Sequence, residues 1–106
     1  MQFKEGRAVA LLTKAKKEDN YSRFRELVYK AVKEEPGFTE AYMLLARRAK
    51  RHEDYSTAEA AYKKVIETCP SFSPLPYFDL GTYYYYNKDY GNASFYLSGF
   101  LNTPGA

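Results

Sequence analysis

His52 and Cys69 are the residues of this sequence best suited to catalysis or metal binding, and each is the only one of its kind. A metal site or a nucleophile activated by a base needs several such side chains close together. Paired carboxylates, such as Glu53-Asp54, fall at expected helix ends and turns rather than in apolar surroundings suited to acid-base chemistry. We therefore expect a protein that is not an enzyme, has no small-molecule substrate and uses neither a metal nor another cofactor.

Aromatic and basic residues offer a different chemistry, that of binding. The 106 residues include 12 Tyr and 7 Phe but no Trp, and four tyrosines are consecutive, Tyr83 to Tyr86. Tyrosine has a rigid ring and a polar tip, which suit a packing seam and a binding surface equally. The formal net charge of +3 is too small to indicate nucleic-acid binding by itself. What these residues do therefore depends on the elements that position them.

A period of 34 residues organises the chain. Pro36, Pro70 and Pro104 are 34 residues apart, and Tyr21, Tyr55 and Tyr90 recur at spacings of 34 and 35 in "DNYSRF", "EDYSTA" and "KDYGNA". Periods of this length are typical of repeat proteins. Between these markers the apolar residues recur at helical spacing, so each unit is predicted to be a pair of helices of about 13 residues. We expect Ser73 to cap the fifth helix, with Pro74 at its first position.

In these features the chain resembles the tetratricopeptide repeat family over nearly its whole length. The second unit, from Thr39, carries the signature residues Tyr42, Leu45, Ala46, Tyr55, Ala58, Tyr62, Val65 and Pro70. The third, from Pro74, carries Tyr77, Leu80, Gly81, Tyr84, Tyr90, Ala93 and Phe100. The first is degenerate, with Leu12 and Phe24 where the family has small residues. The resemblance implies an all-α fold, a right-handed α-solenoid of three antiparallel helix pairs, with repeats at about 5–38, 39–72 and 73–106 in one domain.

The family's register also implies a concave groove that binds a partner segment. It places Tyr84 in the core, Tyr83 against the adjoining helix pair, and Tyr85 and Tyr86 in the groove. The groove residues so predicted are Lys16, Lys17, Met43, Arg47, Lys50, Arg51, Phe78, Thr82, Tyr85 and Tyr86. Such a groove, basic at one end and aromatic at the other, favours an acidic protein or peptide ligand. A solvated face with no ligand is the alternative interpretation of its charges. The positions that grip chaperone tails in some members are not matched here, so we expect no adaptor of that type.

The tyrosine-rich third unit, the apolar last helix and the distribution of charge bear on other roles and on localisation. The tyrosine-rich third unit is similar to repeats of Bacteroidetes OmpA-like envelope lipoproteins, which suggests an assembly element of a bacterial envelope or secretion complex. The apolar last helix, "NASFYLSGFL", could pair with a second copy or with further repeats of a longer protein. RNA binding is disfavoured because the basic surface is short. The run "AVALL" is too brief for a membrane span, so we expect a soluble segment, cytoplasmic or, in an exported parent protein, periplasmic.

Overall fold

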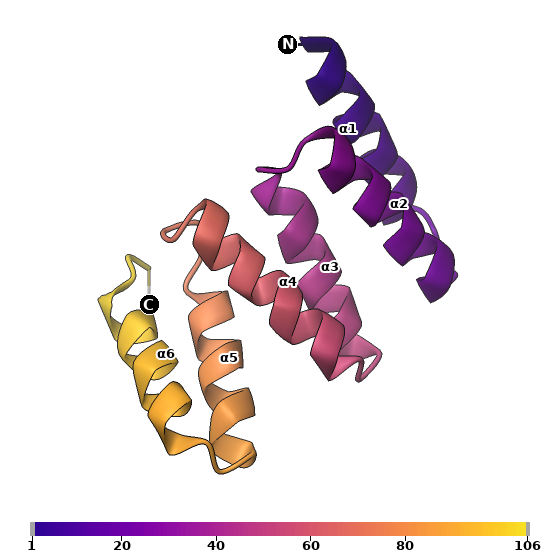
Figure 1. Ribbon diagram of the computed structural model, residues 1–106. Helices are drawn as coiled ribbons and strands as arrows, with labels where there is room; N and C mark the ends of the chain where they lie inside the picture. Colours follow the sequence, from indigo (N-terminus) through magenta and orange to yellow (C-terminus); the bar gives the residue numbers. More distant parts are fainter. Residues whose placement is uncertain (1, 106) are drawn as a thin grey trace.

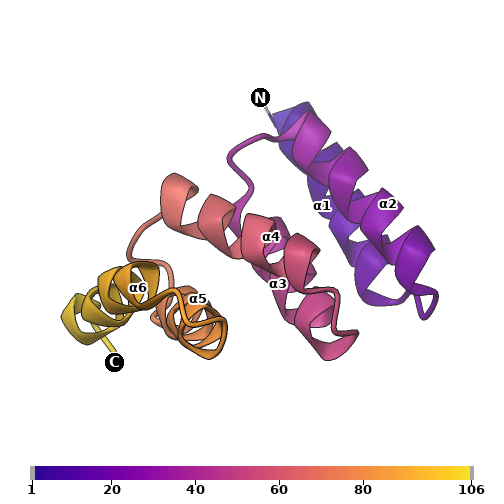
Figure 2. The ribbon, with the colours of Figure 1, turned by 60° about the horizontal axis from the view of Figure 1, so that its bottom comes forward.

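The computed structural model describes residues 2–105, and within them all the regular secondary structure is α-helical (Figure 1). The six helices are α1 (Gln2–Lys16), α2 (Tyr21–Glu34), α3 (Thr39–Arg51), α4 (Tyr55–Thr68), α5 (Leu75–Tyr86) and α6 (Tyr90–Asn102). Consecutive helices pair into three antiparallel hairpins, α1/α2, α3/α4 and α5/α6, which follow one another in chain order in both views (Figures 1 and 2). The predicted all-α solenoid of three helix pairs is confirmed.

The second helix of every hairpin begins in the same way. Asn20, Asp54 and Asp89 are the N-caps of α2, α4 and α6, and each side chain accepts a hydrogen bond from the backbone N–H three residues later. Such a cap satisfies an amide that the helix leaves unpaired. It follows that the repeated tyrosines, Tyr21, Tyr55 and Tyr90, are the first residues of these helices.

The turns within the second and third hairpins also match. Glu53 and Lys88 adopt left-handed backbone angles, with φ of 59° and 64°. The next residue closes the turn, because the N–H of Asp54 donates to the carbonyl of Ala49 and that of Asp89 donates to the carbonyl of Tyr84, both at 2.9 Å. This pattern satisfies carbonyls at the end of the preceding helix.

Helix α5 begins one residue later than predicted. Pro74 is the N-cap rather than the first helical residue, and Pro76 lies in the first turn. The hydroxyl of Ser73 still accepts a hydrogen bond from the N–H of Leu75, at 3.1 Å. A proline has no N–H to donate, so the capping bond falls to the next residue.

The core runs through all three hairpins, and the two helices of each hairpin contact one another more extensively than neighbouring hairpins do. Small residues let the helices approach closely within it. A Cβ added at Gly81 of α5 would lie 2.6 Å from Cγ of Leu97 in α6. Within residues 2–105, no helix has the length and apolar character needed to cross a membrane.

Candidate functional site

Two hollows lie where neighbouring hairpins meet, and together they form the candidate binding surface. The first, which we call the basic pocket, has a volume of about 500 Å³ and lies between α1, α3 and the loop before α5. Its walls are Lys16, Glu40, Met43, Leu44, Arg47, Arg48, Arg51, Phe72 and Ser73. They include four cationic side chains and one carboxylate.

Not all of the cations in the basic pocket are available to a ligand. Lys16 is 3.3 Å from the carboxylate of Glu40. Arg48 donates to the backbone carbonyl of Asp19 at 2.9 Å, and its guanidinium lies 4.4 Å from the ring centre of Phe24. Within residues 6–105, the exposed side chains of Arg47 and Arg51 form no ion pair. These two guanidinium groups are therefore the main charge offered to an anion.

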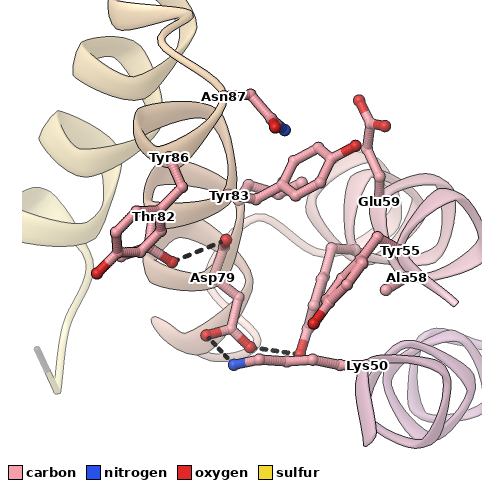
Figure 3. A pocket seen from close by; sticks show the side chains of 11 residues that line it. Lys50, Tyr55, Ala58, Glu59, Asp79, Thr82, Tyr83, Tyr86 and Asn87 are labelled. Carbon is pink, nitrogen blue, oxygen red and sulfur yellow. Dashed lines mark hydrogen bonds and ion pairs between the residues drawn. The ribbon is translucent and has the colours of Figure 1, made fainter. Parts of the chain in front are cut away.

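The second hollow, which we call the tyrosine pocket, has a volume of about 450 Å³ and lies between α4 and α5 (Figure 3). Lys50 reaches it from α3. The other residues that line it are Tyr55, Ala58, Glu59, Tyr62, Asp79, Leu80, Thr82, Tyr83, Tyr86 and Asn87. Aromatic rings thus make up much of its wall.

A buried carboxylate forms one side of the tyrosine pocket. The side chain of Asp79 is 5% exposed. It accepts a hydrogen bond from the hydroxyl of Tyr62 at 2.5 Å and forms an ion pair with Lys50 at 3.1 Å (Figure 3). Burial, followed by the bond to Asp79, raises the pKa of Tyr62 well above its ordinary value. Tyr62 therefore remains a neutral donor.

The second carboxylate of the tyrosine pocket is also paired. Glu59 accepts a hydrogen bond from the hydroxyl of Tyr84 and forms an ion pair with Lys63 at 3.1 Å. The bond from Tyr84 is the main reason that the pKa of the Glu59 carboxyl lies below its ordinary value. Glu59 therefore stays ionised, and the ammonium group of Lys63 compensates its charge.

The four consecutive tyrosines take different environments within one turn of α5. Tyr84 is buried and stacks on Tyr96 of α6, with ring centres 5.7 Å apart, while Tyr83 stacks on Tyr55 of α4 at 6.1 Å. Tyr85 and Tyr86 are exposed. The predicted core position of Tyr84 and the predicted contact of Tyr83 with the adjoining hairpin agree with the structure.

The predicted groove residues divide into three groups. Lys16, Met43, Arg47 and Arg51 line the basic pocket, with Met43 buried in its wall. Lys50, Thr82 and Tyr86 line the tyrosine pocket. Lys17, Phe78 and Tyr85 line neither pocket.

The three predicted groove residues outside both pockets are two aromatic side chains that pack on α6 and one exposed lysine. Phe78 packs on Phe100 of α6 at 5.3 Å, and Tyr85 packs on Tyr90 at 5.7 Å, so both rings turn toward the last helix. Lys17 follows the end of α1 and is exposed. Lys50, predicted as a groove cation, is largely committed to Asp79.

The sequence analysis did not place Arg48, Glu59 or Tyr62 at the binding surface. Each becomes part of a pocket wall because two hairpins meet there. The helical periodicity of one unit carries no signal for such contacts, although it did place Tyr62 among the core positions.

The residues considered for catalysis, His52, Cys69 and Asp54, contact other parts of the fold or lie at a helix end. His52 stacks on the ring of Tyr21, with centres 4.3 Å apart. Cys69 is half-buried at the end of α4. Asp54 accepts a hydrogen bond from the hydroxyl of Tyr21 at 2.6 Å, and that bond is the main cause of the lowered pKa of its carboxyl. Among the residues that the structure describes, no cluster of His, Cys, Asp and Glu could hold a metal ion.

Comparison of the chain with protein-family models and with curated proteins gives no match.

Proposed function

We propose that the chain is a protein-interaction module that binds an acidic segment of a partner at the basic pocket. The observation that carries this proposal is the pair of exposed guanidinium groups, Arg47 and Arg51, one helical turn apart on α3 beside a 500 Å³ hollow. Arginine binds carboxylates through paired hydrogen bonds of fixed geometry. A segment with two or more carboxylates matches this arrangement.

The proposal includes membership of the tetratricopeptide repeat family. Its support is the 34-residue spacing of the prolines together with three hairpins whose second helices share one type of N-cap. Proteins built from such repeats commonly bind partners on an extended surface formed by successive units. The two pockets lie along such a surface.

The test is binding of a fluorescein-labelled peptide of six glutamates, measured by fluorescence anisotropy at low and at physiological salt. The double variant Arg47→Glu/Arg51→Glu should weaken binding at least about tenfold, because each lost charge-assisted hydrogen bond costs about 1.5–3 kcal/mol. Lys50 is left unchanged because Lys50→Glu would place a second carboxylate beside buried Asp79.

The matched control is Lys30→Glu/Lys33→Glu, which changes two exposed cations of α2 outside both pockets. It alters the net charge by the same amount. If both double variants weaken binding equally, the attraction is a long-range effect of total charge and the proposed site is wrong. A labelled hexalysine peptide should not bind to the wild-type protein.

A second candidate function is assembly through the ends of the solenoid, as a scaffold within a larger complex such as a bacterial cell envelope. The specific observation that favours it is the exposed surface of α6. This helix carries no charged residue, and Phe95 and Leu101 are 69% and 76% exposed. Exposed apolar side chains on a helix without charges are suited to packing against another chain.

A further inference from the structure

We call the contact between the first and second hairpins the first seam, and the contact between the second and third hairpins the second seam. The tyrosine pocket lies at the second seam, which lacks a side chain that the first seam has. Phe24 and Ala58 are equivalent, since each is the fourth residue of its helix, three positions after the repeated tyrosine. Phe24 is fully buried, and its ring also contacts Arg48 of the next hairpin. At the second seam Ala58 lines the 450 Å³ hollow instead. An aromatic ring therefore packs at the first seam, while the corresponding region of the second is open.

The charges around this hollow favour a neutral guest. Asp79 forms an ion pair with Lys50 (Figure 3) and accepts a hydrogen bond from Tyr62. Glu59 likewise forms an ion pair with Lys63 and accepts a hydrogen bond from Tyr84. A cationic guest would have to displace a lysine that is already in place, and an anionic one would meet two carboxylates. The remaining walls are mainly rings and apolar groups, among them Tyr55, Tyr83 and Leu80.

We propose that the tyrosine pocket binds an aromatic side chain, Tyr or Phe, of a partner protein. The ring would pack against Tyr55 and Tyr83 in edge-to-face or offset geometry, the arrangements that aromatic groups prefer. The Asn87 amide at the pocket suits the phenol of a tyrosine, and the Thr82 hydroxyl, which donates to the backbone carbonyl of Asp79 at 3.1 Å, can still accept a hydrogen bond from it.

The position of α3 links this pocket to the basic pocket. Arg47 and Arg51 line one hollow and Lys50, on the same turn, lines the other. One extended segment can therefore place carboxylates in the first and an aromatic ring in the second. This link rests on the proposed function, whereas the aromatic preference of the tyrosine pocket does not.

The test uses p-cresol, the side-chain analogue of tyrosine, and ethylguanidinium, the analogue of arginine. Binding is followed by the NMR signals of the Leu80 and Thr82 methyl groups, with the Leu11 methyl groups on α1 as reference. p-Cresol should shift the Leu80 and Thr82 signals in a saturable way and leave Leu11 unchanged. Ethylguanidinium should shift none of them.

The variant Ala58→Phe copies the first seam and should abolish the p-cresol shifts at Leu80. If circular dichroism shows that this variant does not fold, Thr82→Trp serves instead, because Thr82 lines the hollow and is only half-buried. The proposal is overturned if p-cresol leaves the wild-type signals unchanged, if ethylguanidinium shifts them as strongly, or if the p-cresol shifts persist in a folded blocking variant.

A second measurement separates this inference from the acidic-ligand proposal. A peptide of four glutamates followed by Gly-Gly-Tyr should bind about three- to tenfold more tightly than its Gly-Gly-Ala counterpart. The gain should vanish in the folded variant that blocks the tyrosine pocket, Ala58→Phe or Thr82→Trp. Because p-cresol carries no carboxylate, its binding stands or fails independently of the basic pocket.

Discussion

The hydroxyl of Tyr62 in α4 donates to Oδ2 of Asp79 in α5 at 2.5 Å, and so joins the second and third hairpins by a buried polar bond. Lys50 of α3 lies 3.1 Å from the other carboxylate oxygen. A buried charge is tolerated only when such partners replace the water that it loses. The carboxylate of Asp79 therefore connects three helices, α3, α4 and α5, from two hairpins.

Tyr62→Phe should lower the free energy of unfolding by about 1–3 kcal/mol, because it removes one of the two partners of a buried carboxylate. Urea unfolding followed by circular dichroism measures the change. Tyr29→Phe is the matched control, since Tyr29 is 48% exposed, and it should change stability by less than about 0.5 kcal/mol. Equal effects of the two substitutions would show that the bond to Asp79 contributes nothing.

The bond between Tyr21 and Asp54 predicts a pH dependence. The pKa of the Asp54 carboxyl is lowered in the folded protein, first by this bond, so its contribution to stability is complete above the unfolded value of about 3.9 and is lost at lower pH. The pKa of Tyr21 is raised, mainly by burial and then by the bond, so its contribution is present below about pH 10 and is lost above it.

Tyr21→Phe should therefore reduce the melting temperature most between about pH 6 and 9, and the difference from wild type should shrink toward pH 3. Thermal unfolding across this range, with Tyr29→Phe as control, measures it. A difference between wild type and Tyr21→Phe that stays constant with pH would mean that the effect comes from lost ring packing, for example on His52, and not from the carboxylate.

Gly81→Ala should destabilise the third hairpin although alanine is the better helix former. The added Cβ would lie 2.6 Å from Cγ and 3.2 Å from the backbone nitrogen of Leu97, so α5 and α6 must separate, at a cost of about 1–3 kcal/mol. Gly6→Ala in α1 is the control, because nothing lies within 4 Å of its added Cβ, and it should stabilise by up to about 1 kcal/mol. Stabilisation by both substitutions would contradict the close approach of the two helices.

The exposed surface of α6 predicts self-association at high protein concentration. Phe95→Ser/Leu101→Ser should reduce the average mass measured by light scattering, while Val9→Ser, at a 52% exposed position of α1, should not. High salt should leave the association intact because α6 carries no charge. A monomeric wild-type chain at all concentrations would remove self-association through α6 from consideration.

The helices and their pairing could be predicted from the sequence because local signals fix them. The repeated tyrosines, the Asn or Asp caps before them and the helical spacing of apolar residues all act within one hairpin. The environments of Tyr83 and Tyr84 were instead predicted from the register that the resemblance to tetratricopeptide repeats implies.

The charge pattern of the binding surface could not be predicted in the same way. Lys16 forms an ion pair with Glu40, and Lys50 with Asp79, only because of how each hairpin is oriented relative to the next and which rotamers the long side chains adopt. The open space beside Ala58 likewise arises only where two hairpins meet. These contacts lie between units, and the periodicity of one unit carries no information about them.

The contrast between extensive contacts inside each hairpin and sparse contacts between hairpins has a kinetic consequence. Most native contacts join residues close together along the chain, so the cost of closing long loops is small and folding should be fast. The α3/α4 hairpin has a neighbour on both sides, whereas each outer hairpin has one within the described chain. Opening should therefore proceed inward from the two ends, and the backbone amides of α3 and α4 should be the last to exchange with deuterium.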